Sequence, residues 1–139
     1  MSNSKKIKSM KLKGKVLLIA ITLMIAFAGC KKYPDGPGFS PWPKKWRLDG
    51  TWKISEYVNN GVTTTPTDIY TITFKHNGDF SETSGAFSVS GKWAWADSKD
   101  DITITIDGTA STSKILKLEM KQLWFQDPSS LEESHYVPN

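Results

Sequence analysis

The chain has one cysteine and two histidines among its 139 residues. A single thiol cannot form a disulfide within the chain, so the fold must be stabilised by its core alone. A catalytic zinc site needs about three protein ligands at defined spacings, and neither His76 nor His135 lies in a His, Asp and Glu cluster that would supply them. The sequence therefore predicts neither a metal nor another cofactor.

Other signals of an active site are also missing. Serine and threonine are frequent, but the chain has no nucleophile elbow and no glycine-rich phosphate loop. Two pairs of adjacent acids, Asp100-Asp101 and Glu132-Glu133, would place their carboxylates on opposite faces of a strand. We therefore expect that the protein is not an enzyme.

The N-terminus is basic and then apolar. Residues 1–15 hold six lysines and no acid, and residues 16–28 form an uncharged apolar run. This order is typical of a secretory signal, and thirteen residues are fewer than the roughly 20 that a membrane-spanning helix needs. We predict a signal peptide over residues 1–29, with an uncleaved N-terminal membrane helix as the alternative.

The cysteine lies where the apolar run stops. Phe27-Ala28-Gly29-Cys30 resembles the lipobox of bacterial lipoproteins, in which the cysteine is acylated and becomes the new N-terminus. The resemblance implies that Cys30 is the lipid attachment site, with palmitate-like chains, and two or more chains hold a protein firmly on a membrane. Lys31 stands where an aspartate would favour inner-membrane retention, so we expect an outer-membrane address in the cell envelope. The alternative for Cys30 is an ordinary buried side chain.

The net charge of +4 comes from the predicted signal peptide. Six of the eighteen basic residues precede Cys30, so a chain that begins there has twelve basic and fourteen acidic residues, a net charge of about −2. This balance does not favour nucleic acid as a partner. Residues 30–45 keep four lysines, four prolines and two glycines, and are expected to be a flexible tether whose lysines either attract anionic headgroups or keep it soluble.

From residue 46 onward, apolar and polar residues alternate with a period of two, as in strands with one buried face. Asn77-Gly78 is predicted to form a two-residue type I′ hairpin turn. Eight strands are expected, over residues 51–58, 69–75, 79–83, 86–96, 101–107, 112–120, 123–126 and 132–137. Their short connections favour an antiparallel meander, so residues 46–139 are predicted to form an all-β, eight-stranded up-and-down barrel, with a β-sandwich as the alternative.

Six segments in this order also resemble a known family. They are "LDGTWKI", "YTITFKHNGDF", "SGKWAW", "ITI", "KILKLEMKQLWF" and "SHYVP". Behind a lipobox, this succession is similar to the small lipocalin-like domain lipoproteins of Gram-negative bacteria. The resemblance implies that Gly50 and Trp52 match the Gly-x-Trp signature and that Trp52 closes one end of the barrel.

Aromatic side chains on the apolar faces are the remaining functional signal. The candidates are Tyr70, Phe74, Phe87, Trp93 and Trp95. They predict either a pocket for a small hydrophobic ligand or a filled barrel core. Trp42 and Trp46 either pack across the barrel mouth or mark a surface for a partner. The chain is thus expected to bind a small hydrophobic ligand, or else to act as a protein-interaction or inhibitor module of the envelope.

Overall fold

The computed structural model describes residues 33–36, 40–97 and 100–139. The predicted signal peptide, Cys30 and Lys31 lie outside the described residues, as do residues 37–39 of the predicted tether. All the described residues belong to one compact unit, which spans residues 31–139.

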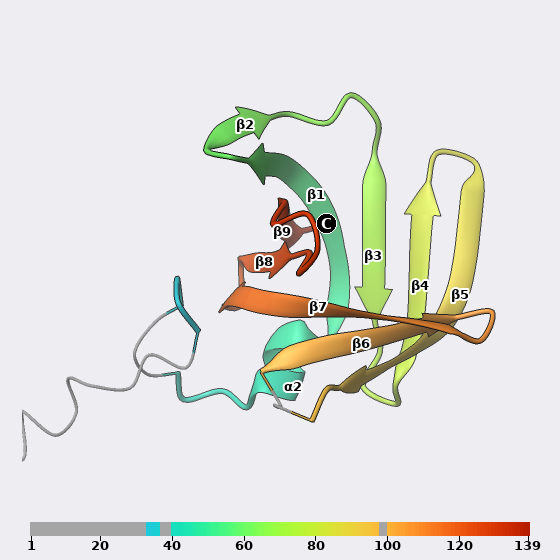
Figure 1. Cartoon of the computed structure of the whole chain (residues 1–139). Coiled ribbons are helices and arrows are strands. Elements are labelled where there is room, and N and C mark those ends of the chain that lie inside the picture. Colours follow the sequence, from blue (N-terminus) through green and yellow to red (C-terminus); the bar gives the residue numbers. More distant parts are fainter. Residues whose placement is uncertain (1–32, 37–39, 98–99) are drawn as a thin grey trace, which may run out of the picture. The chain divides into compact units, whose positions relative to one another are not determined.

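This unit is almost entirely β-structure (Figure 1). One short helix, α2 (Lys44–Leu48), precedes the strands. The strands are β1 (Gly50–Asn59), β2 (Val62–Thr64), β3 (Tyr70–Phe74), β4 (Asp79–Ser84), β5 (Phe87–Trp95), β6 (Asp101–Ile106), β7 (Thr109–Leu118), β8 (Leu123–Gln126) and β9 (Glu133–Pro138).

The strands close into an antiparallel barrel. Eight strands form the ring, β1 and β3 to β9. Consecutive strands from β3 to β9 pair with one another, and β1 pairs with both β3 and β9 to close the ring. The short β2 pairs only with the end of β1 and lies outside this ring. The predicted eight-stranded barrel is therefore confirmed and the sandwich alternative is wrong. The expected strands match the observed ones closely, except that β2 was not predicted and β7 begins three residues earlier than expected.

Two-residue turns set the register of two hairpins. Asn60 and Gly61 both have positive φ, as do Asp107 and Gly108, which is the requirement of a type I′ turn. The predicted type I′ turn at Asn77-Gly78 is wrong in type, because only Gly78 has positive φ. The hairpin tip is nevertheless there: the Gly78 N–H donates to the Lys75 carbonyl at 2.9 Å.

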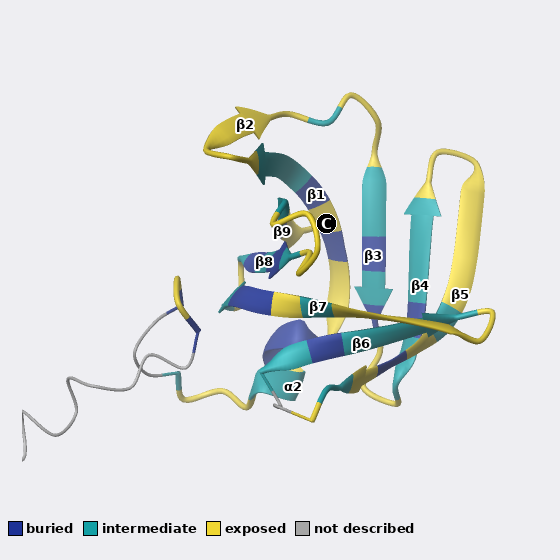
Figure 2. Cartoon of the chain, viewed as in Figure 1, coloured by how far each residue is buried: buried dark blue, intermediate teal, exposed yellow. Residues whose placement is uncertain are grey.

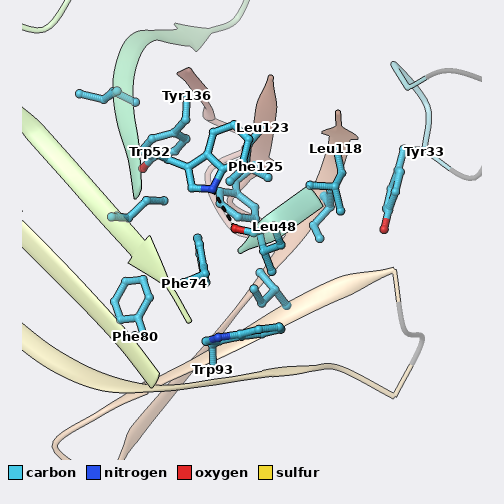
Figure 3. Close-up of a cluster of buried hydrophobic side chains, with 14 residues drawn as sticks. Tyr33, Leu48, Trp52, Phe74, Phe80, Trp93, Leu118, Leu123, Phe125 and Tyr136 are labelled. Atoms are coloured by element: carbon cyan, nitrogen blue, oxygen red, sulfur yellow. Dashed lines mark hydrogen bonds between the residues drawn. The ribbon is translucent and has the colours of Figure 1, made fainter. Parts of the chain in front are cut away.

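Alternate residues of each strand face the barrel interior. Phe74 pairs with Phe80 across β3 and β4, and Trp93 pairs with Ile104 across β5 and β6. Residues of β2 and of the first half of β5 are exposed, whereas buried residues occur in the other strands (Figure 2). The buried cluster combines aromatic and aliphatic side chains from almost every strand of the ring (Figure 3).

The segment before β1 differs from the predicted tether. Tyr33 is 2% exposed and belongs to the core cluster, and the Asp35 N–H donates to the Leu116 carbonyl of β7 at 3.0 Å. Lys44 and Lys45 begin α2, which Pro43 precedes as N-cap. The prolines do exclude a long helix, but Pro is compatible with the N-terminal end of a short one, and Tyr33 gains burial by packing on the barrel.

Candidate ligand-binding cavity

The two ends of the barrel differ, and α2 covers one of them. Leu48 of α2 is completely buried, and the Trp52 indole N–H donates to the Leu48 carbonyl at 2.9 Å (Figure 3). The Arg47 guanidinium donates to the Leu118 carbonyl at the end of β7. Gly50 has a φ of +139°, which glycine tolerates far better than other residues, and it leads the chain from α2 into β1. These contacts close the end of the barrel at which β1 begins.

An aromatic layer fills the interior next to this closed end. The ring of Phe74 lies at its centre, with centroids 5.3 Å from Phe80, 5.8 Å from Trp93 and 6.1 Å from Phe125. The Trp93 indole N–H donates to the Lys75 carbonyl at 2.9 Å, so its polar atom is satisfied. Edge-to-face and tilted contacts of this kind stabilise cores beyond their buried area.

Beyond this layer, toward the opposite end, lies a cavity of about 490 Å³. Its apolar part is formed by Ile72, Phe80, Ile104 and Phe125. Its polar part carries the hydroxyl groups of Ser111, Ser113, Ser134, Tyr70 and Tyr136. The cavity is therefore amphipathic, with an apolar floor and a wall rich in hydroxyl groups.

The volume of the cavity follows from the sequences of β6 and β7. The isoleucines of β6 face small residues of β7: Ile102 pairs with Ser113 and Ile104 with Ser111. Serine fills much less space than the aromatic residues on the facing strands of the core. The alternation of β7 thus places small polar side chains inside the barrel where other strands place large ones.

Two tyrosines line the cavity from β3 and β9, the two strands that flank β1 in the ring. Tyr70 of β3 lies near the Glu82 carboxylate of β4, and burial, followed by nearby Tyr136 and Glu82, raises the Tyr70 pKa. Tyr136 of β9 lies beside Tyr70, with ring centroids 6.4 Å apart, and its pKa is also raised, mainly by burial. Both phenols therefore stay neutral at physiological pH and can donate or accept hydrogen bonds.

Three carboxylates complete the cavity wall. Glu82 comes from β4, and Asp127 and Glu132 come from the connection between β8 and β9. Glu132 faces the cavity, whereas Glu133 contacts His135 outside, so these neighbouring acids point to opposite sides as the sequence predicted. No lysine, arginine or histidine lines the described cavity.

The structure places the five predicted aromatic residues in three different environments. Tyr70 lines the cavity. Phe74 and Trp93 are buried in the aromatic layer, and Trp95 is half-buried against Trp93 at 5.5 Å between centroids. Phe87 is 82% exposed, so the prediction that it is buried on an apolar face is wrong. Its strand extends past the part of the barrel where opposing strands cover the inner face. The role of these residues in binding stays a prediction.

Most cavity residues were not identified from the sequence. Glu82, Ser111, Ser113, Ser134 and Tyr136 all lie on inward faces of their strands. Polar residues at inward-facing strand positions would have identified the cavity wall. The clearest case is β7, where Ser111 and Ser113 occupy alternate positions. Aromatic content alone pointed instead to the filled part of the core.

Outside the barrel, two further groups of side chains have notable contacts. Trp42 and Trp46 are 51% and 58% exposed and stack with centroids 6.3 Å apart beside α2, not across the open end of the barrel. His135 is buried against Trp124, with centroids 3.9 Å apart, and its two ring nitrogens lie 2.9 Å from carboxylate oxygens of Glu56 and Glu133. Among the described residues, no group of three or more His, Cys, Asp or Glu could hold a metal ion. In the same part of the chain, no helix is long and apolar enough to cross a membrane.

A closed eight-stranded antiparallel barrel with one covered end and an internal cavity has the architecture of a lipocalin-like fold. The sequence model of the lipocalin-like domain family matches residues 48–125, which is more than half of the chain. The chain belongs to this family. A comparison with curated proteins found no match.

Solved structures agree with this assignment at the level of the fold. A crystal structure of a lipocalin-like protein from Bacteroides uniformis is 16% identical, with a TM-score of 0.58, and the match covers 67% of this chain and 99% of that one. An NMR structure of a protein from the same species is 15% identical, with a TM-score of 0.52, covering 66% of this chain and 88% of that one. A crystal structure of a protein from Bacteroides vulgatus is 12% identical, with a TM-score of 0.52, and the match covers 69% of this chain and 96% of that one.

Proposed function

We propose that this protein binds a small, largely apolar ligand in the barrel cavity. The observation that carries the proposal is the cavity of about 490 Å³ between the aromatic layer and the open end. Ligand sites in proteins are typically concave, with volumes of roughly 300–1,000 Å³, and combine apolar walls with a few placed polar groups. The floor and the hydroxyl-rich wall have this composition.

The apolar floor supplies the affinity in this proposal. Ile72, Ile104 and Phe125 would cover the ligand body, and apolar burial contributes about 25 cal/mol per Å². A ligand that buries on the order of 300 Å² could gain several kcal/mol before the costs of immobilisation. The aromatic layer fills the part of the barrel interior next to α2, and the cavity occupies the part beyond it. In this proposal, only the second part would take the ligand.

Membrane anchorage is the second part of the proposal. The lysine-rich start, the apolar run and Ala28-Gly29-Cys30 support a signal peptide and a lipid on Cys30. Anchored in the cell envelope, with the outer membrane as the preferred address, the barrel would capture apolar molecules close to the membrane. Binding without catalysis is part of the same proposal.

A protein-interaction or inhibitor module is the second candidate. The stacked and exposed Trp42 and Trp46 favour it, because large aromatic side chains are frequent at the centres of protein interfaces. Under this alternative, replacing both tryptophans would abolish partner binding and leave the cavity unaffected.

Filling the cavity tests ligand binding directly. Ser113→Leu adds an apolar side chain at a half-buried position of β7 that lines the cavity, whereas Ala110→Leu adds the same side chain at an exposed position of β7 that does not line it. In calorimetric titrations with 1-octanol, we expect the first variant to lose at least tenfold in affinity and the second to bind like the unchanged protein. Equal binding by both variants, or no binding by the unchanged protein, would contradict the proposal.

A further inference from the structure

The charges around the cavity are all of one sign. Glu82, Asp127 and Glu132 are carboxylates, and no basic side chain lines the described cavity to neutralise them. Asp127 accepts hydrogen bonds from the backbone N–H groups of Ser129 and Ser130, at 2.7 and 3.0 Å. The Ser129 hydroxyl also donates to this carboxylate, and it and the two backbone donors hold the pKa of Asp127 below its usual range. These contacts come from backbone amides and hydroxyl groups, so the negative charge remains.

The field of Glu82 extends across the barrel interior. It contributes to the raised pKa values of Tyr57 on β1, Tyr70 on β3 and Tyr136 on β9, in each case as a smaller cause than burial and one other nearby group. Glu132 acts on Tyr57 in the same direction. A cationic group entering the cavity would meet an attractive potential from more than one side.

The carboxylates suit an organic cation better than a metal ion. No group of three or more acidic, histidine or cysteine side chains among the described residues could coordinate a metal. Aromatic rings line the same cavity as the carboxylates: the centroid of Tyr136 is 6.4 Å from that of Tyr70 and 5.9 Å from that of Phe125. Aromatic faces attract ammonium groups, and they do so most strongly where water is excluded.

We propose that the ligand of this cavity is a lipophilic ammonium compound, with its apolar body on the isoleucine and phenylalanine floor and its cationic head between the carboxylates of Glu82 and Glu132. This inference rests on the proposed function, since it specifies the chemistry of the same cavity. A fatty acid would fit the floor equally well but would bring a fourth carboxylate among three, which like-charge repulsion disfavours.

Three ligands with alkyl chains of seven or eight carbons differ mainly in head-group charge, so comparing them separates the effect of charge from that of apolar burial. The protein is titrated calorimetrically with octyltrimethylammonium, 1-octanol and octanoate, all below micellar concentrations. We expect the ammonium compound to bind at least tenfold more tightly than the alcohol, and octanoate to bind most weakly.

Two variants then locate the effect. Glu82→Gln preserves side-chain size and should lower ammonium affinity about threefold to tenfold more than it lowers 1-octanol affinity. Asp107→Asn is the matched control, because Asp107 is an exposed carboxylate in the β6–β7 turn, does not line the cavity, and has a positive φ that asparagine tolerates. Circular dichroism should show that both variants remain folded, and Glu132→Gln provides a second cavity variant.

Each outcome of these titrations is decisive. Octanoate binding as tightly as the ammonium compound would overturn the inference and leave the proposed apolar site intact. Equal losses in Glu82→Gln and Asp107→Asn would also overturn it, because surface charge would then explain the preference. If none of the three ligands binds, the proposed function fails, and the inference fails with it.

Discussion

At the scale of single residues, Trp52 links the covered end of the barrel to the core. Its indole packs under α2, and its N–H is bonded to the Leu48 carbonyl. The burial of a large ring and the satisfaction of its one polar atom explain why tryptophan suits this position. The family resemblance implied a tryptophan that closes one end, and the structure places Trp52 at the α2 end.

Replacing Trp52 should therefore be costly. We expect Trp52→Ala to lower the free energy of unfolding by about 3 to 5 kcal/mol through lost burial and the cavity that remains. Trp52→Phe should cost less, about 1 to 3 kcal/mol, because it keeps most of the ring but leaves the Leu48 carbonyl without its donor. Urea unfolding measures both.

Trp46 provides the matched control for Trp52. It is a tryptophan of the same region, 58% exposed, so Trp46→Ala should change stability by less than about 1 kcal/mol. If Trp52→Ala cost no more than Trp46→Ala, the packing described for Trp52 would be wrong.

At the scale of elements, β5 joins two different parts of the barrel. Its first half, from Phe87, is exposed, and its second half, with Trp93, is buried in the aromatic layer. Gly91 lies between the halves. A Cβ at this position would lie 2.2 Å from the Thr105 carbonyl oxygen of β6 and 3.0 Å from the Ile106 side chain. The close approach of the two backbones therefore requires glycine.

This contact predicts that Gly91→Ala destabilises the barrel, although alanine usually suits a strand at least as well as glycine. We expect a loss of about 1 to 3 kcal/mol, because either β5 or β6 must shift. Ser90→Ala, at the neighbouring exposed position, should be nearly neutral. Thermal unfolding of both variants tests the prediction, and a Gly91→Ala variant as stable as Ser90→Ala would show that the strands are free to separate.

Element boundaries were predicted well where turns are encoded locally. Asn60-Gly61 and Asp107-Gly108 specify tight hairpins because their residues accept positive φ. The three-residue β2 carries no alternation long enough to detect, and the five-residue α2 lies in a proline-rich segment that argues against helices. Both short elements depend on what they pack against or pair with.

At the scale of the whole molecule, the proposal joins an anchored N-terminus to a barrel with an amphipathic cavity. The segment that begins at Tyr33 packs on the barrel, so little chain would separate a lipidated Cys30 from the folded unit. The barrel would then be held near the membrane surface. This arrangement suits a protein that exchanges ligands with a lipid phase.

The anchor has its own test. Cys30→Ser removes the sulfur that would carry the lipid, so we expect the protein to leave the membrane fraction or to accumulate uncleaved. Mass spectrometry of the unchanged protein from native membranes should show an acylated Cys30 at the N-terminus. An unmodified thiol there would contradict anchorage, while recovery in the inner membrane alone would contradict only the outer-membrane address.

The sequence by itself predicted eight of the nine observed strands, their order and a closed barrel, with a β-sandwich as the alternative. Period-two alternation and short turns are local properties, and they leave an antiparallel meander as the simplest way to bury one face. The sequence also determined that Trp52 would occupy a covered end, through the family resemblance. Tertiary structure alone decided which inward residues line a cavity. Phe74 and Phe87 share the same alternation, yet one is completely buried and the other is exposed, because depth along the barrel depends on stagger between strands and on which end α2 covers. The acidic wall also arises only on closure, since Glu82 of β4 and Glu132 of the β8–β9 connection are far apart in the sequence.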